Sequence, residues 1–514
     1  MKWKNLRART IRWENTTLKI LGQVEMLFAV VLLIPALFAV AFGEDPMPFL
    51  FPVPVLFAIG TIQYMTCTES KTFRAVNGIL LVAITWALMF IICTIPYLLS
   101  GLDLLSSFFE AVSGITTTGS TVIGDLSLQP MSLLIWRALT QWIGGITVVL
   151  IFLYFLPTVG YGRGLFHNEL IGSGSSTYIQ KSSMAGKSFI IVYLFLSAIN
   201  FALLLICGVA PIEAMCLMFT TISTGGLTIL NSGLSGYSDP VQWITILFMF
   251  LGGTNFYLHF RSLYLRERGV YRKNSEFRIM AAWFIAISLI ITALMVLSEY
   301  NEGILTLETF YTTFKAAIFT TVSLGTTTGF YIEDFTLWPS QCMLLLMLVS
   351  LIGASASSTS GGLKFSRLRV MYEYIKIGFR NTIHSNAVYS VKIDGKTVDD
   401  SVISGAIVVF MMYAASLIVC ATIIMIMGYD IVDSFGLAIS SISNGGMGFG
   451  NFGPTGDYVG LGTGVKVVML VFMWIGRLEV VTALILLTPG FWKDVWLNSR
   501  ARRRAKAALS RRGD

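Results

Sequence analysis

Long runs of apolar residues limit how this 514-residue chain can fold more strongly than any other feature of its sequence. The longest runs cover residues 24–42, 75–99, 189–207, 280–297 and 402–427. A helix rises about 1.5 Å per residue, so roughly 20 apolar residues are needed to cross a hydrocarbon core about 30 Å thick. Charged residues make up only 12% of the chain, against about 25% in soluble proteins. The sequence therefore predicts an all-α polytopic membrane protein.

The first apolar run, residues 24–42, has two interpretations. The sequence AVAFGED at residues 39–45 resembles the small-residue cleavage site of a secretory signal peptide. The polar segment before the run is long for a signal peptide, however, and the rest of the chain is membranous. We therefore expect a retained transmembrane helix.

The cysteines and histidines do not indicate a catalytic or metal centre. The cysteines (Cys67, Cys93, Cys207, Cys216, Cys342 and Cys420) are scattered singly, so we expect small core residues and not a disulfide or metal framework. The histidines (His167, His259 and His384) are far apart, whereas a metal-dependent hydrolase needs clustered ligands. The sequence GYGRG at residues 160–164 lacks the βα unit of a nucleotide loop and is expected to be a turn. No nucleophile–base pair is recognisable, so the sequence does not predict an enzyme.

Basic and acidic groups alternate between the apolar runs, and the net charge is +8. The basic groups contain Lys2, Lys4, Arg7, Arg9 and Arg12, then Lys71 and Arg74, and further residues within 163–187, 261–278, 364–396 and 500–512. The acidic connections contain Glu44, Asp45, Asp125, Asp239, Glu299, Glu302, Glu333, Asp334, Asp430, Asp433 and Asp457. By the positive-inside rule, the basic groups and both termini are expected in the cytoplasm. The basic tail is equally compatible with binding anionic membrane lipids, and no nucleic-acid partner is expected.

Four short polar segments that contain glycine recur at nearly even intervals. They are Thr117, Thr118, Gly119 and Ser120; Ser223, Thr224, Gly225 and Gly226; Thr327, Thr328, Gly329 and Phe330; and Asn444, Gly445, Gly446 and Met447. The stretches before them cover residues 102–115, 211–222, 307–322 and 431–442. These stretches of roughly 12–16 residues are too short to span a membrane. We therefore expect four re-entrant helices, each followed by a non-helical loop.

The four polar segments are typical of an ion pathway. Non-helical backbone at membrane depth is tolerated only where it is buried in protein or lines a watery cavity. Glycine allows the positive φ that turns successive carbonyls the same way, and rings of carbonyls replace the hydration shell of a cation. The negative ends of the short helices would point toward the same axis. Four ordinary surface loops are the alternative, but their recurrence after four short helices favours a pore.

Two other classes of membrane protein are weaker alternatives. A secondary transporter with broken helices at the midplane is expected to have inverted halves, whereas these four units run in the same orientation. A structural scaffold gives no reason for the polar segments.

Five further segments carry a resemblance to a known family. They are RALTQWIGG (137–145), FMFLGGTNFYLHFRSL (248–263), SSTSGGLKFSR (357–367), NAVYSVKIDGK (386–396) and GRLEVVTALILLTPGFW (476–492). With the four loops, they make nearly the whole chain similar to the potassium-translocating subunits of the Trk/Ktr/HKT superfamily, most closely the TrkH type.

The resemblance implies four helix–pore-loop–helix repeats around a pseudo-fourfold pore. The expected divisions are an N-terminal cytoplasmic segment and extra transmembrane hairpin (1–70), repeats 1 to 4 (71–165, 166–270, 271–395 and 396–500) and a basic cytoplasmic tail (501–514). The hairpin would consist of residues 24–42 and about 49–64. The resemblance also implies K⁺ as the transported ion, a multi-pass protein of the cytoplasmic (inner) membrane, a homodimer, and a separate TrkA-like regulatory ring that binds nucleotide in the cytoplasm.

The resemblance assigns the selectivity filter to Gly119, Gly225, Gly329 and Gly446 with their flanking residues. Four filter glycines go with a preference for potassium over sodium in this superfamily. The fourth loop, ISNGGMGFG (442–450), departs from the usual Asn-Asn-x-Gly-Pro-Gly pattern at Ser443 and Met447. A symporter coupled to H⁺ or Na⁺, or a less selective Na⁺/K⁺ transporter, is the alternative function.

Two features of the sequence resemble parts of a gate. The segment GASASSTSGG (353–362) interrupts the expected second helix of the third repeat. Because Gly and Ser favour non-helical conformations, we expect an intramembrane loop below the filter, although close helix packing through small residues is an alternative. The expected gate residues are Gly353, Ser357, Ser358, Thr359, Gly361, Gly362, Lys364 and Arg477.

Arg477 lies within an apolar run, residues 465–487. An arginine at membrane depth costs about 2.5–3.5 kcal/mol or more, so we expect it to face the pore cavity or a carboxylate. Glu479 is expected on another helix face and is not its obvious partner. An arginine that snorkels from a helix end is the alternative.

Overall fold

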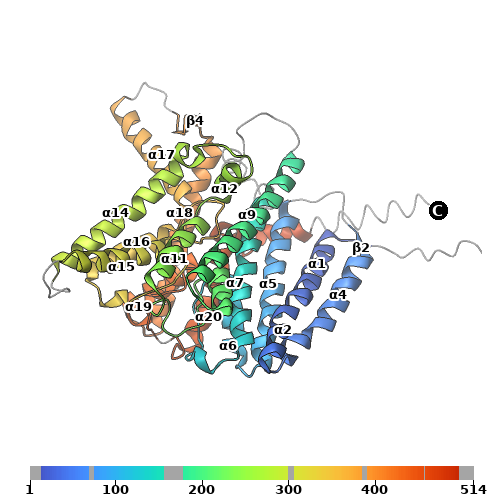
Figure 1. Ribbon diagram of the computed structural model, residues 1–514. Helices are drawn as coiled ribbons and strands as arrows, with labels where there is room; N and C mark the ends of the chain where they lie inside the picture. Colours follow the sequence, from blue (N-terminus) through green and yellow to red (C-terminus); the bar gives the residue numbers. More distant parts are fainter. Residues whose placement is uncertain are drawn as a thin grey trace, which may run out of the picture.

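The computed structural model describes residues 13–68, 75–154, 178–298, 306–384, 390–456 and 458–496. In this part of the chain, the protein is a bundle of helices with two short two-stranded pairings (Figure 1). Several of the charged residues considered above, together with GYGRG and His167, lie outside the described residues. These charged residues are Lys2, Lys4, Arg7, Arg9, Arg12, Lys71, Arg74, Glu299, Glu302, Asp457 and those of the basic tail.

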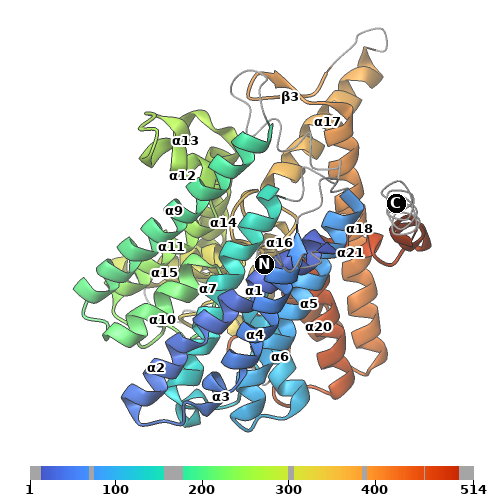
Figure 2. The ribbon, with the colours of Figure 1, turned by 90° about the vertical axis from the view of Figure 1, so that its right-hand side faces the viewer.

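The N-terminal part forms the expected helical hairpin. Its elements are β1 (Trp13–Glu14), α1 (Thr16–Val31), α2 (Leu33–Phe42), α3 (Met47–Leu50), α4 (Pro52–Thr66) and β2 (Cys67–Thr68). Helix α1 begins earlier than the predicted residue 24, because the Asn15 side chain caps it by accepting a hydrogen bond from the Leu18 amide. Helices α1 and α4 cross closely at Gly22 and Gly60, where an added Cβ would lie 2.6 Å from the carbonyl oxygen of the other glycine. Figures 1 and 2 show this hairpin as a layer beside α5 and α7.

Four helical units follow the hairpin. The first contains α5 (Ala75–Leu99), α6 (Leu104–Ile115), the 3₁₀ turn η1 (Leu126–Leu128) and α7 (Met131–Tyr154). The second contains α9 (Tyr178–Ile206), α10 (Pro211–Ile222), α11 (Asp239–Gly252) and α12 (Phe256–Leu263), and α13 (Val270–Lys273) links it to the next. The third contains α14 (Ser275–Leu297), α15 (Leu307–Gly325), η3 (Phe335–Leu337), α16 (Ser340–Ile352) and α17 (Phe365–Ile383). The fourth contains the antiparallel pair β3 (Lys392–Ile393) and β4 (Lys396–Thr397), α18 (Asp400–Ile426), α19 (Ile431–Ser443), η4 (Gly450–Phe452), α20 (Thr463–Arg477) and α21 (Val480–Ile485).

The predicted apolar runs and short stretches are helical, but several bounds differ: α9 begins at Tyr178 and α14 at Ser275, before the predicted residues 189 and 280, and the run 24–42 is divided between α1 and α2. The short helices α6, α10 and α19 have 12, 12 and 13 residues. Helix α15 has 19 residues. It continues past the predicted end at residue 322 to Gly325, two residues before the polar segment 327–330 begins. The four short helices thus all end immediately before their polar segments.

The last helix of the second, third and fourth units is interrupted. Helices α11 and α12 are bent by 100°, and Asn255 between them caps α12 by accepting from the Tyr257 amide at 2.9 Å. Helices α16 and α17 are separated by the predicted small-residue segment, and α20 and α21 by Leu478 and Glu479. The small-residue segment of the third unit predicted its interruption, whereas the interruptions of the second and fourth units were not predicted.

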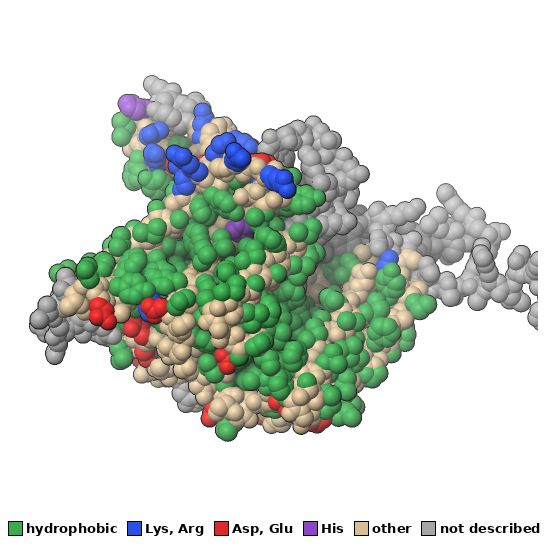
Figure 3. All heavy atoms as spheres, viewed as in Figure 1, with side chains coloured by type: hydrophobic (Ala, Val, Ile, Leu, Met, Phe, Trp, Pro, Cys, Tyr) green, Lys and Arg blue, Asp and Glu red, His purple; other side chains and the backbone are tan. Residues whose placement is uncertain are grey.

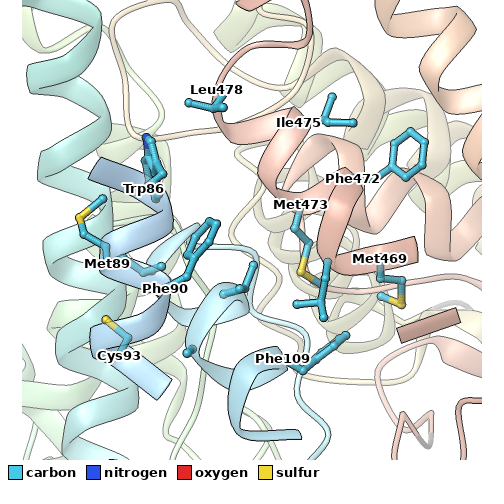
Figure 4. Close-up of a cluster of buried hydrophobic side chains, with 14 of the residues drawn as sticks. Trp86, Met89, Phe90, Cys93, Phe109, Met469, Phe472, Met473, Ile475 and Leu478 are labelled. Carbon is cyan, nitrogen blue, oxygen red and sulfur yellow. The ribbon is translucent and has the colours of Figure 1, made fainter. Parts of the chain in front are cut away.

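The first and fourth units pack against each other and close the bundle. Trp86 and Phe90 of α5 and Phe109 of α6 belong to the same buried cluster as Met469 and Met473 of α20 (Figure 4). A second buried cluster joins the second and third units. Contacts between the first and last units allow the four short helices to surround one axis.

The surface is apolar around the middle of the bundle. In the described residues, six helices are long and apolar enough to cross a membrane, or seven if α11 and α12 form one span. Large apolar side chains such as Leu37 and Leu297 are 70% and 83% exposed, as expected for a surface in contact with lipid. Lys and Arg side chains gather at the end that carries α17 and β4, and Asp and Glu gather at the other end (Figure 3). The chain is therefore a polytopic helical membrane protein, as predicted.

The cysteines behave as core residues. All are free thiols, and all are buried except Cys207, which is half-buried.

Candidate functional site

The four polar segments leave their short helices by the same backbone path. The amides of Thr118, Gly225, Thr328 and Gly445 donate to the carbonyls of Ser113, Thr220, Ser323 and Ser440 at 2.9, 2.9, 2.7 and 3.0 Å. The preceding residues, Thr117, Thr224, Thr327 and Asn444, have φ of 55°, 50°, 55° and 54°. We name the matched segments loop 1 (117–120), loop 2 (224–227), loop 3 (327–330) and loop 4 (444–447). Their shared geometry shows that the four units are structural repeats at this site.

The matched backbone corrects the predicted alignment of loop 2 by one residue. The third residue of each loop is a glycine with positive φ: 89° at Gly119, 78° at Gly226, 86° at Gly329 and 77° at Gly446. The predicted match of Gly225 with Gly119 is therefore wrong, because Gly225 occupies the place of Thr118. Ser223 is the residue after α10 and precedes the loop. Adjacent glycines left the sequence alignment ambiguous, and the requirement for positive φ resolves it.

The third-position glycines join the loops into a closed ring. A Cβ added to Gly119 would lie within 3.0 Å of the Gly225 carbonyl oxygen. The same holds for Gly226 against Thr328, Gly329 against Gly445 and Gly446 against Thr118. Each loop thus packs its glycine against the second residue of the next loop, and the fourth returns to the first. No other residue type leaves room for these contacts.

A buried glutamine, missed in the sequence, braces loop 2. Gln141 of α7 is fully buried. Its Nε2 donates to the Gly225 carbonyl at 2.7 Å, and its Oε1 accepts from the Leu227 amide at 3.1 Å. The sequence feature that could have identified Gln141 was its position as a polar residue in the middle of the apolar segment RALTQWIGG.

A buried ion pair, also missed, braces the chain after loop 1. Arg137 Nε lies 3.1 Å from Glu110 Oε2, and neither side chain is more than 1% exposed. Glu110 Oε1 accepts from the Val122 amide and the Thr121 hydroxyl, both at 2.7 Å. A buried pair requires such additional hydrogen bonds. Its signal was a carboxylate within a short apolar stretch, residues 102–115.

The segment between α16 and α17 lies against the ring, at the first residues of loops 2 and 3. We name residues 353–364 the α16–α17 loop. Thr359 Oγ1 lies 3.2 Å from Thr224 Oγ1, and the Gly361 amide donates to Thr327 Oγ1 at 2.7 Å. A Cβ on Gly361 would collide with the Ser443 carbonyl, so this loop also touches the entry to loop 4.

The ends of the α16–α17 loop are pinned together. Gly353 and Gly362 have φ of 71° and 75°, and neither has room for a Cβ against the other's backbone. The Lys364 amide donates to the Ile352 carbonyl at 2.9 Å, and the Lys364 ammonium donates to the Ser360 carbonyl. These contacts make a compact non-helical loop, so continuous helix packing through small residues is the wrong alternative here.

The remaining predicted gate residues lie in the same loop. Ser358 Oγ donates to the Ser355 carbonyl at 2.6 Å, and the Ser357 carbonyl accepts from the Phe256 amide of α12 at 3.1 Å. Glu276 of α14 accepts from Ser355 Oγ at 2.8 Å and from the Ala356 amide at 3.0 Å. The loop is thus held by the second, third and fourth units.

Arg477 lies at the end of α20 and not within a continuous helix. It is 5% exposed, so the alternative of a snorkelling arginine is wrong. Its Nη1 donates to the Thr359 carbonyl at 3.2 Å. Glu479 pairs instead with Arg367 of α17, as expected from its separate orientation. The sequences WIGG (142–145), FLGG (250–253) and WIGR (474–477) share a contact, because a Cβ on Gly144, Gly252 or Gly476 would lie 3.0 Å or less from the carbonyl oxygen of Ile115, Ile222 or Ile442. With LIGA (351–354) of the third unit, they show that Arg477 stands where the other repeats have a small residue.

Comparisons with known proteins agree with this architecture. The family model TrkH, described as "Cation transport protein", matches residues 49–492. The chain is 30% identical to the Trk system potassium uptake protein TrkH of Vibrio parahaemolyticus, over 93% of this chain and 99% of the relative. It is 28% identical to the protein of the same name in Escherichia coli K12, again over 93% and 99%. These relatives are named as transport proteins and not as enzymes.

A solved structure has the same fold. The crystal structure of the potassium transporter TrkH from Vibrio parahaemolyticus matches with a TM-score of 0.83 and 28% sequence identity. The match covers 95% of this chain and 100% of that chain.

Proposed function

The chain belongs to the TrkH family of cation transport proteins, and we propose that it takes up potassium through the ring formed by loops 1 to 4. The observation that carries this proposal is the ring in which the third-position glycine of each loop packs against a backbone carbonyl of the next loop. Both the relatives' names and the architecture support potassium as the transported substrate. The protein is then a transporter and not an enzyme.

Selectivity is proposed to arise from the backbone of the four loops. A dehydrating cation needs oxygen ligands on all sides to replace its water. Alternating φ signs within each loop orient neighbouring carbonyls alike, and the short helices direct their partial negative charge toward the same place. The filter set is therefore Thr117, Thr118, Gly119 and Ser120, with the matching residues of loops 2 to 4.

The α16–α17 loop and Arg477 are proposed to gate this path. The loop engages Thr224 Oγ1 and Thr327 Oγ1, whereas Thr117 Oγ1 and Asn444 Oδ1 are buried without a hydrogen-bond partner in the described residues. Two of four matching oxygens are thus occupied by protein groups. An ion at this level needs them, so the loop must withdraw before conduction.

The orientation follows from the distribution of charge. We place the basic end, with α17 and β4, in the cytoplasm (Figure 3). The homodimer and the TrkA-like nucleotide-binding ring implied by the resemblance would then have their regulatory contacts at this end.

The test is ion flux in liposomes that contain the purified full chain. K⁺, Na⁺ and a proton ionophore are varied independently. We expect K⁺ flux to exceed Na⁺ flux and to persist when the proton gradient is collapsed. Flux that requires Na⁺ or a proton gradient would replace the proposed pore by a coupled symporter, and absence of K⁺ flux from folded protein would contradict the proposal.

A further inference from the structure

A cavity lies between loop 4, the α16–α17 loop, α18 and the interruption between α20 and α21. Its volume, measured as the space open to the centre of a water-sized sphere, is about 20 Å³, which is room for one or two small species such as water. The side chains that line it include Lys364, Arg367, Tyr413, Arg477 and Glu479. These residues come from the third and fourth units, so the cavity exists only when the α16–α17 loop lies as described.

The charges around this cavity do not balance. Arg367 and Glu479 form an ion pair and compensate each other. Arg477 is 5% exposed and has no carboxylate partner within the described residues. Lys364 is equally buried and donates to Ser360 oxygens, and the Glu479 and Glu276 carboxylates stabilise its charge. Burial of charge without a counter-charge is costly, so the charge of Arg477 calls for an anion.

The unpartnered polar atoms of the lining are mainly donors. Arg477 Nε and Nη2 and the Tyr413 hydroxyl are buried and have no hydrogen-bond partner within the described residues. A guanidinium can only donate, and a phenol is a good donor. Asn444 Oδ1 is the one unpartnered acceptor among the lining residues. The donors of Arg477 and Tyr413 favour an anion at their end of the cavity, because water there would leave the charge of Arg477 uncompensated.

We propose that this cavity binds a small inorganic anion of the halide class, with chloride as the expected ligand. Arg477 and Tyr413 donate hydrogen bonds to it, and Lys364 contributes charge. Because Arg477 also donates to the Thr359 carbonyl, the anion stabilises the position of the α16–α17 loop against the ring. Binding of the anion does not depend on the proposed potassium transport.

The experiment uses the purified full chain at constant K⁺, with chloride replaced stepwise by gluconate. We expect the thermal unfolding midpoint to rise with chloride and to saturate. The rise should be lost in Arg477→Gln and reduced in Tyr413→Phe, which removes a single donor. The matched control is Arg261→Gln, which removes a charge from an exposed ion pair with Glu267 and should keep the full rise.

A second measurement locates the anion directly. Crystals grown with bromide should show an anomalous peak in the cavity beside Arg477. A wild-type midpoint that is independent of chloride, or a rise that Arg477→Gln and Tyr413→Phe both retain, would overturn the proposal. If Arg477→Gln does not fold, the Tyr413→Phe midpoint and the bromide peak decide. Since none of these readouts involves transport, their failure leaves the proposed function untouched.

Discussion

Substitution of Gly226 by alanine tests both the ring and its corrected alignment. An alanine at the φ of 78° costs about 1–2 kcal/mol from backbone strain alone. Its Cβ would also collide with the Thr328 carbonyl oxygen, a backbone atom that cannot rotate away. That oxygen has to retreat by about an ångström to reach the shortest real contact, so loop 3 moves with it.

The expected consequence is loss of selectivity. If the displacement weakens K⁺ binding in the ring by about 1.4 kcal/mol, discrimination over Na⁺ falls about tenfold. Fluxes of K⁺ and Na⁺ are measured in liposomes at equal amounts of monodisperse protein. The matched control is Gly208→Ala, because Gly208 has a φ of 83° with nothing within 4 Å of an added Cβ. It carries the same strain without the collision and should keep the wild-type ratio.

Gly225→Ala separates the two alignments. The three atoms nearest to its Cβ all belong to the Gln141 side chain, which can move or be removed. In a Gln141→Ala background, Gly225→Ala should therefore add little, whereas Gly226→Ala should still lower K⁺ over Na⁺ discrimination about tenfold. Unchanged fluxes in Gly226→Ala, together with lost selectivity in Gly225→Ala without Gln141, would refute the reasoning.

Three further substitutions test the gate and its support. Thr359→Val removes the hydroxyl that lies 3.0 Å from the Gly252 carbonyl, so basal K⁺ flux should rise at equal protein levels; reduced flux would contradict a blocking role of the loop. Arg477→Ala should also raise K⁺ flux in chloride-free buffer, where no anion offsets the charge, because a unit charge about 4 Å from the ion at an effective dielectric near 20 adds a barrier of about 4 kcal/mol. Arg477→Lys keeps the charge but not the planar hydrogen-bond donor, so it should raise flux only if Arg477 also holds the loop in place through that hydrogen bond. Lower flux in folded Arg477→Ala would contradict both the charge barrier and the hydrogen-bonded latch. Glu110→Ala leaves Arg137 buried and unpaired, so it should destabilise the protein by about 3–5 kcal/mol, and an unchanged thermal unfolding midpoint would show that the pair is dispensable.

The sequence was sufficient for the architecture because membrane spans and re-entrant helices depend on length and hydropathy alone. The ends of α6, α10 and α19 follow from apolar stretches that stop at polar residues. The interruptions after Gly252 and Arg477 were missed because apolar residues resume on both sides, and hydropathy does not register a change of direction. The sequence Gly-Gly-Thr-Asn at residues 252–255 was the available signal, since Asn255 caps the next helix.

The details of the site depended on contacts between segments that are far apart in the chain. The bond of Gln141 to Gly225 joins the first unit to the second, and no local pattern identifies such a partner. The alignment of Gly226 likewise required a backbone conformation that adjacent glycines both permit. Arg477 was noticed as a buried charge, but its end-of-helix position depends on the turn at Glu479, which has a φ of 59°.

The ring is nearly fourfold in its backbone and asymmetric in its surroundings. Loop 1 is followed by the Glu110–Arg137 pair, and loop 2 is braced by Gln141, so these contacts come from helices α6 and α7. Thr224 and Thr327 are instead engaged by the α16–α17 loop, which also accepts a hydrogen bond from Arg477. Arg477 of the fourth unit stands where the other repeats have glycine or alanine, so the proposed gating contact is present in only one of the four units. Under the proposed function, conduction is switched by moving a single loop, while the glycine contacts that hold the ring together remain closed.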